Sequence, residues 1–293
     1  MINRVTNQGL AIASQRNLQL SLSTLSKLQE TASSLKRISV PSDDPAGTAD
    51  SIRVRSEQNA VAQFSRNISD GNSWLGVVDT ALDKTGDILR KVRDLTVQGA
   101  NDGALSPTQK EAIAIELETL RAELLTTANT QYLGRSVFAG TSDAGVAFTP
   151  DLAFTGSGSP VERRTGASTT IRVDGDGTAA FGEGADSVFA LVDSIVADLR
   201  GGTNVGPRLT EVDERMRAIL GQQGAVGARQ AQVLKAQGAN VSTSIALEAQ
   251  RAGVEDIDLG QAIIDLKSQE VSYQAALAVT ARAMQQNLME FLR

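Results

Sequence analysis

The sequence predicts a mainly α-helical fold in which long helices from both ends of the chain pair antiparallel, with a small β-rich domain inserted between them. The C-terminal stretch 259–293 contains no glycine or proline beyond Gly260. Its apolar residues recur in steps of four and three. A helix of this length extends roughly 50 Å and needs a second long helix along it. Leucines with the same spacing at 18–35 supply that second helix.

The two apolar seams give the first set of candidate assembly residues. They are Leu18, Leu22, Leu25, Leu28 and Leu35 near the start, and Ile263, Leu266, Tyr273, Leu277, Met284 and Phe291 near the end. Glu270, Thr280 and Asn287 interrupt the second seam. Because isolated helices with little apolar burial are marginal in water, we expect both ends to become fully ordered only on assembly.

A turn at 39–46 is predicted to end the first helix, which we expect from about Asn7 to Ile38. Pro41 and Pro45 disfavour helix in the residues before them. Asp44 is a good N-cap, and Pro45 suits the first position of a second helix reaching about Gln98. Asp43 and Asp44 could also be taken as metal ligands, but no other ligands lie nearby in the sequence. The pattern favours a corner between helices.

Three further helices are expected. Ser106, Pro107 and Gln109 form the capping-box pattern that opens a third helix, with its buried face at Ile113, Leu117, Leu120 and Leu124. A fourth is predicted from Asp186 to the Gly201-Gly202 stop. A long one follows from Pro207, and we expect Gly253 and Gly260 to separate it from the C-terminal helix.

The middle of the chain differs in composition, with ten glycines between Gly134 and Gly184 and short β-type runs at 135–139 and 169–173. We expect residues 141–184 to fold as a local unit. Asp174 and Asp176 resemble the start of a calcium-binding loop, but Thr178 and Ala185 replace two of its ligands. A hairpin turn is therefore the favoured interpretation there.

These observations predict five segments. They are an N-terminal coiled-coil segment (1–44), a helical core in two parts (45–132 and 186–252) around a glycine-rich β domain (133–185), and a C-terminal coiled-coil segment (253–293).

Composition excludes several classes of function. The chain has no His and no Cys, which removes the common zinc sites, cysteine nucleophiles and His-based triads. Its net charge is −6 with scattered basic residues, so neither nucleic acid nor an anionic membrane is a predicted partner. No apolar run approaches the roughly 18 residues of a membrane span, and residues 1–20 lack the apolar core of a signal peptide. No cofactor or metal is expected.

Several motifs together resemble the flagellin superfamily. The segment 36–46 is similar to that family's arginine, proline and paired-aspartate signature, which adds Arg37, Pro41, Asp43, Asp44 and Pro45 to the candidate assembly residues. Ser73-Trp74-Leu75 followed by 79–82 resembles the hook-associated branch. Residues 132–141, 226–229, 273–277 and 291–293 are similar to other parts of the family pattern, so the resemblance covers nearly the whole chain.

The resemblance implies a structural subunit rather than an enzyme. We expect a component of the junction layer between hook and filament, exported unfolded by the flagellar type III apparatus without a cleaved signal peptide, and located outside the cell. Its implied partners are other copies of itself, the first hook-associated protein, flagellin, and an export chaperone that binds the C-terminal helix.

Three alternatives stay open at this point. Flagellin shares the terminal pattern, although the proline-flanked turn and Trp74 depart from what flagellins usually show. A wall-degrading enzyme with helical appendages would need paired acids in a cleft, for which Asp174, Asp176 and Glu183 are loose candidates. A signalling coiled coil would explain the seams but not the glycine-rich middle.

Overall fold

The computed structural model describes residues 7–101, 103 and 105–291, without the side chains at 7–8, 10–11 and 283–291. Its long helices are α1 (Asn7–Ser34), α2 (Pro45–Gly99), α3 (Pro107–Ala128), α5 (Val188–Gly201), α6 (Arg208–Glu255) and α7 (Leu259–Phe291). Between α3 and α5 lie the strands β1 (Gln131–Tyr132), β2 (Arg135–Ser136), β3 (Glu162–Arg164) and β4 (Thr170–Arg172), the short helix α4 (Gly177–Phe181) and a 3-10 turn (Gly184–Asp186).

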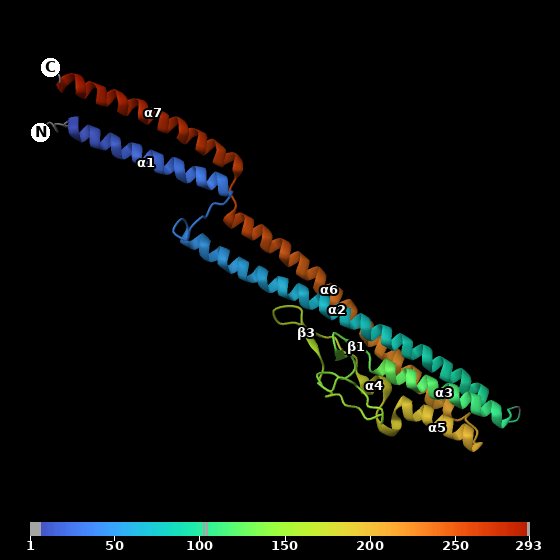
Figure 1. Ribbon diagram of the computed structural model, residues 1–293. Helices are drawn as coiled ribbons and strands as arrows, with labels where there is room; N and C mark the ends of the chain where they lie inside the picture. The colour runs from blue at the N-terminus through green and yellow to red at the C-terminus, as the bar shows by residue number, and fades with distance from the viewer. Residues whose placement is uncertain (1–6, 102, 104, 292–293) are drawn as a thin grey trace. The chain divides into compact units, whose positions relative to one another are not determined.

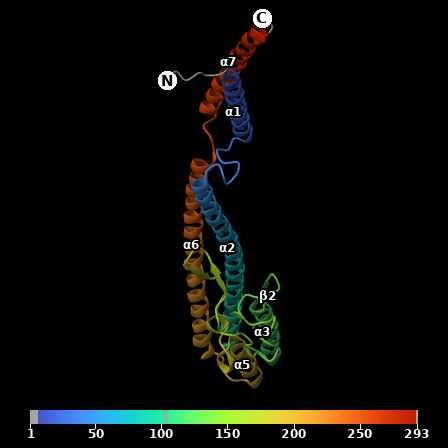
Figure 2. The same cartoon turned by 90° about the vertical axis from the view of Figure 1, so that its left-hand side faces the viewer.

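The chain forms two compact units. The first contains residues up to 59 and from 244 onward, which include α1, α7, the start of α2 and the end of α6. The second contains residues 60–243. Within the first unit α1 and α7 pack against each other and run antiparallel (Figures 1 and 2). The predicted fold class, a mainly helical protein with paired terminal helices and a few short strands between them, is confirmed.

The second unit is built on its part of α2, with α3, α5 and α6 packed around it (Figure 1). The apolar face predicted for α3 is buried as expected, at Ile113, Leu117, Leu120 and Leu124. Helix α5 turns Val192, Ile195 and Leu199 into the same core and packs against α3. Most of the unit's apolar burial therefore comes from helix-to-helix contacts.

Local capping signals place most helix ends as predicted. The side chain of Ser106 accepts from the backbone N–H of Gln109, and the side-chain oxygen of Gln109 accepts from the backbone N–H of Ser106, which completes the capping box. Gly202 ends α5 in the left-handed conformation at φ 72°, where glycine carries no Cβ penalty.

Two predicted boundaries were wrong. The first helix ends at Ser34 rather than near Ile38, because Leu35 already has a left-handed φ of 58°. Gly253 lies inside α6 and Gly260 inside α7, so neither glycine makes the break before the last helix. The break is at 256–258, and α7 begins where Asp258 accepts from the backbone N–H of Gln261 (3.2 Å).

The glycine-rich middle contains less strand than predicted. Its four strands form two separate antiparallel hairpins, one pairing Tyr132 with Arg135 and the other pairing Arg163 with Ile171. The predicted hairpin turn at Asp174 and Asp176 was wrong. Asp176 instead caps α4 by accepting from the backbone N–H of Ala179 (3.0 Å).

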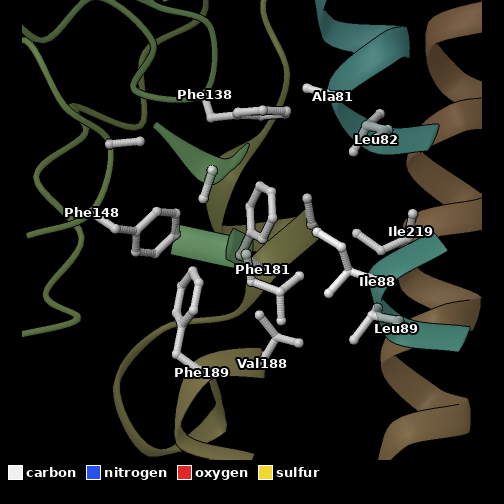
Figure 3. Close-up of a cluster of buried hydrophobic side chains, with 14 of the residues drawn as sticks. Ala81, Leu82, Ile88, Leu89, Phe138, Phe148, Phe181, Val188, Phe189 and Ile219 are labelled. Carbon is white, nitrogen blue, oxygen red and sulfur yellow. The ribbon is translucent and has the colours of Figure 1, made fainter. Parts of the chain in front are cut away.

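Aromatic side chains join this middle segment to the helices. Phe181 contacts both Phe138 and Phe148, and Phe189 of α5 lies against both Phe148 and Phe181. Figure 3 shows these rings beside Ala81, Leu82, Ile88 and Leu89 of α2. The segment therefore shares one hydrophobic core with the helices, and its independent folding, like the five segment boundaries, stays a prediction.

Phe181 offers a test of this shared core. We expect Phe181→Ala to destabilise the protein by about 3–5 kcal/mol, because it leaves a cavity among three other rings. Denaturant unfolding should show one transition at lower denaturant, with the α-helical circular dichroism signal lost together with the near-ultraviolet signal. An early loss of the near-ultraviolet signal alone would mean that the middle segment unfolds by itself.

Candidate assembly interface

The α1–α7 pair buries one face of each helix. On α1 the covered positions are Ser14, Leu18, Ser21, Leu25, Leu28 and Ala32; on α7 they are Ala262, Leu266, Gln269, Tyr273, Ala276 and Thr280. Both sets repeat in steps of four and three, as in a coiled-coil seam. Of these residues only Leu25 is buried. The side-chain amide of Gln269 donates to the hydroxyl of Ser21 across the seam (3.1 Å). The pair is thus held by a narrow and partly polar seam.

The α1 seam predicted from sequence is correct at three of its five leucines. Leu18, Leu25 and Leu28 lie on the covered face. Leu22 and Leu35 are 50% and 53% exposed. Leu22 is one position past Ser21, on the flank of the seam, and Leu35 lies beyond the end of the helix.

The α7 seam is shifted from its predicted position. Leu266 and Tyr273 lie on the covered face, whereas Ile263 and Leu277 are exposed beside it. The small residues Ala262 and Ala276 take the covered positions one step earlier in the chain. The side chains of Met284 and Phe291 lie outside the described residues.

The exposed side of α7 is apolar as well. Ile264 and Val271, seven residues apart and on the side away from the seam, are 63% and 66% exposed, and Val279 follows nearby. On α1, Ile12 and Leu20 are likewise exposed. Exposed apolar patches of this kind mark interaction surfaces. The α1–α7 pair therefore presents apolar surface on its outside that no described residue of the first unit covers.

The corner between α1 and α2 is fixed by its two aspartates. Asp43 accepts from the backbone N–H groups of Ser39 and Val40 (3.2 and 3.1 Å) and from the ammonium group of Lys27 (2.8 Å). These bonds, chiefly the one from Lys27, lower the pKa of Asp43. Asp44 accepts from the N–H of Gly47 (2.8 Å), so it caps α2 as predicted.

The remaining corner residues form the entry to α2. Pro45 is its first residue, as predicted, and Pro41 is exposed in the turn. The guanidinium group of Arg37 lies 3.6 Å from the carboxylate of Asp44. The backbone N–H of Arg37 donates to the carbonyl oxygen of Glu255 (2.7 Å). The corner is therefore tied to the end of α6.

Glu255 is the centre of this connection. Its carboxylate, only 4% exposed, accepts two bonds from Arg55 (both 2.7 Å), one from Arg251 (3.3 Å) and one from the hydroxyl of Ser51. The bonds from Arg55 are the largest of the effects that lower the pKa of Glu255 to about 2. This carboxylate joins the start of α2 to the end of α6, next to the corner.

Glu255 could not be singled out from the sequence. It is one of many acidic residues, and its partner Arg55 lies 200 positions away in the chain. The aspartates of the corner could be found because they act on backbone groups a few residues away.

Of the three candidate catalytic acids, Asp174 and Asp176 are engaged in structural contacts, while Glu183 is exposed. Asp174 is buried, accepts from the backbone N–H of Val161 (2.9 Å) and pairs with Arg172 (2.9 Å), and Asp176 caps α4. Across the residues that the structure describes, no three acidic side chains gather as a metal site would require, and no helix is long and apolar enough to span a membrane.

Comparison with known proteins identifies the family. The model of the bacterial flagellin N-terminal helical region matches residues 5–143, and that of the C-terminal helical region matches residues 209–292, together more than half of the chain. This chain belongs to the flagellin superfamily. The two matches cover the terminal helices and most of the helical core.

Curated relatives with similar sequences are filament proteins. The flagellar filament 33 kDa core protein of Treponema phagedenis is 27% identical over 97% of this chain and 97% of its own length. Flagellin of Bacillus subtilis (strain 168) is 27% identical over 99% of this chain and 100% of its own length.

Two solved structures of flagellar proteins have a similar fold. A putative flagellar hook-associated protein from Vibrio parahaemolyticus has a TM-score of 0.68 at 21% identity, covering 73% of this chain and 100% of that one. Bacillus cereus FlgL has a TM-score of 0.60 at 20% identity, covering 68% and 99%. At these identities the likeness is one of fold.

Glu255→Gln tests the connection between the helices. The variant keeps the shape but loses the charge that three donor residues share, so we expect a loss of about 1–3 kcal/mol in the stability of the first unit. Amide exchange in residues 45–55 and 250–260 should become faster. Glu248→Gln is the control, because Glu248 also accepts from Arg251 but is exposed, and it should cost clearly less stability. Equal effects would argue against a special role for Glu255.

The same carboxylate predicts a dependence on pH. The folded pKa of Glu255 is about 2 and its ordinary value 4.5, so its stabilisation is complete above pH 4.5 and is lost as the pH falls through about 2. The stability difference between wild type and Glu255→Gln should shrink over that range. A constant difference from pH 6 to pH 2 would contradict the assignment.

Proposed function

We propose that this superfamily member is a structural subunit of the bacterial flagellum, in the junction layer between hook and filament. The observation that carries the proposal is the α1–α7 pair, whose outer side stays apolar and exposed at Ile264 and Val271. A subunit held in place by neighbouring copies would cover that surface. The likeness in fold to hook-associated proteins supports the junction over other positions.

The role is structural rather than catalytic. Two of the three acids considered for hydrolysis, Asp174 and Asp176, are used in an ion pair and a helix cap, and the flagellin superfamily consists of assembly subunits. As partners we propose other copies of this chain, the first hook-associated protein on one side and flagellin on the other. Export through the flagellar apparatus without a cleaved signal peptide, with a chaperone bound to α7, belongs to the same proposal and would place the chain outside the cell.

A second candidate is a flagellin of the filament itself. It is favoured by curated relatives that are filament proteins and match almost the full length of this chain. The two candidates differ in copy number and position, since a junction layer is one short zone and a filament is a long polymer of its subunit.

Localisation separates the two. Gold labelling of a tagged chain on isolated flagella should mark a single zone next to the hook, and a deletion strain should keep its hooks while releasing flagellin into the medium. Label along the whole filament would show the flagellin alternative to be correct. Absence of label from flagella would contradict both.

Val271→Asp tests the part played by α7. Val271 is exposed in the isolated chain, so the change should leave folding within about 0.5 kcal/mol of wild type. A charge buried against a neighbour is costly, so incorporation into flagella, measured by quantitative blotting, should fall steeply. Gln274→Asp adds the same charge at a position that is already polar and exposed, and should incorporate better. Normal incorporation of Val271→Asp would show that this face stays in solvent.

A further inference from the structure

Helix α6 carries a second apolar face, beside the one that packs into the core of its unit. The buried face contains Val212, Ile219, Val226 and Val233. The outer face repeats in steps of four and three and consists of Leu220, Gly224, Gly227, Ala231, Leu234 and Gly238, all exposed. Leu220 and Leu234 are 62% and 60% exposed. We call this set the α6 outer seam; its spacing is that of a helix-contacting face.

The glycines of the α6 outer seam have no explanation inside the unit. A Cβ atom added at Gly224, Gly227 or Gly238 would meet nothing within 4 Å. Glycine inside a helix is unfavourable relative to alanine, so three at seam positions weaken α6 without any gain in its own packing. Residues without side chains do allow the backbone of another helix to approach closely.

Helix α3 has an outer face of matching spacing. It consists of Ala112, Ile115, Thr119, Ala122 and Thr126, all exposed. The hydroxyls of Thr119 and Thr126 donate to backbone carbonyls one turn earlier (both 3.0 Å), so each threonine has its donor satisfied within the helix. Ile115 is the one large side chain of this set, which we call the α3 outer seam.

The two seams differ in charge. Residues 215–247 contain no Asp or Glu, and the α6 outer seam is bordered by Arg217 and Lys235. Among the described residues neither has an ion-pair partner. The α3 outer seam is bordered by acidic residues instead, of which Glu116 is exposed and unpaired within the described chain, while Glu123 pairs with Lys84 (3.1 Å).

We propose that the α3 outer seam of one copy packs on the α6 outer seam of the neighbouring copy. The proposal rests on the proposed function in taking a second copy as the occupant. Pairing α6 with α6 would bring the positive charges of Arg217 and Lys235 of both copies together. Pairing α3 with α3 would bring together the acidic residues that border the α3 outer seam. Contact between the two unlike faces avoids both repulsions and is therefore favoured. Such heterologous contacts build rings or helical layers.

Chain direction suggests the register. Helices α3 and α6 run the same way within the unit, as the colour change in Figure 1 shows. A rotation about an axis along the helices keeps them parallel between copies. Placing Ile115 opposite Gly227 then sets Thr119 opposite Ala231 and Ala122 opposite Leu234, so that large residues meet small ones along the seam.

Cysteine cross-linking tests the contact directly, because the chain has no Cys of its own. Cells would produce two full-length single-cysteine variants together, Thr119→Cys and Ala231→Cys, and their isolated flagella would be oxidised. A covalent dimer is expected from the mixture and from neither variant alone. A dimer from one variant alone would show like faces in contact. Both chains present without a dimer would overturn the proposed contact, while both chains absent from flagella would count against the proposed function.

Gly227→Leu separates this contact from folding. The added side chain has open space in the isolated unit, so thermal stability should be equal or higher, whereas incorporation into flagella should fall at least about tenfold. Gly221→Leu is the matched control, since Gly221 is on the same helix with the same open space but off the seam. Incorporation of Gly227→Leu at the level of Gly221→Leu would overturn the proposal.

Discussion

A pair of helices can bury only one face of each helix, and this limit governs the first unit of the molecule. The α1–α7 seam relies on Leu18, Leu25, Leu28, Leu266 and Tyr273, with serine, glutamine and alanine between them. On the other side of α7, Ile264 and Val271 stay in solvent. In the second unit α2 is more fully covered, because three helices and a cluster of aromatic rings pack around it. The α1–α7 pair is thus the part of the chain whose stability increases most when neighbouring copies cover its apolar surface.

The connection that directs the terminal helices depends on buried charge and backbone capping rather than on apolar packing. Glu255 draws Arg55, Arg251 and Ser51 together, and its carbonyl oxygen holds the backbone of Arg37. Asp43 and Asp44 stabilise the turn between α1 and α2. Because directional bonds fix geometry more narrowly than apolar contacts do, this arrangement can hold one angle between helices that have little shared surface.

Sequence reasoning succeeded where the signal was local and failed where it required a partner. The capping box at Ser106, the proline at the start of α2 and the leucines at 18, 25 and 28 follow from spacing alone. The shift of the α7 seam onto Ala262 and Ala276 depends on which face meets α1, and alternative apolar positions such as Ile263 and Leu277 gave an equally good repeat. The break at Asp258 was missed because the prediction took the nearby glycines as the helix ends and did not consider an aspartate N-cap.

The central claim is that the terminal pair is completed by neighbouring copies, and hydrogen exchange tests it most directly. Backbone amides of residues 12–34 and 259–282 would be compared with those of α3 in the free chain and in isolated flagella. The account predicts rapid exchange of the terminal helices in the free chain, strong protection of α3 in both states, and protection of the terminal helices after assembly. Terminal amides that exchange as slowly as α3 in the free chain, or that stay unprotected in flagella, would contradict it.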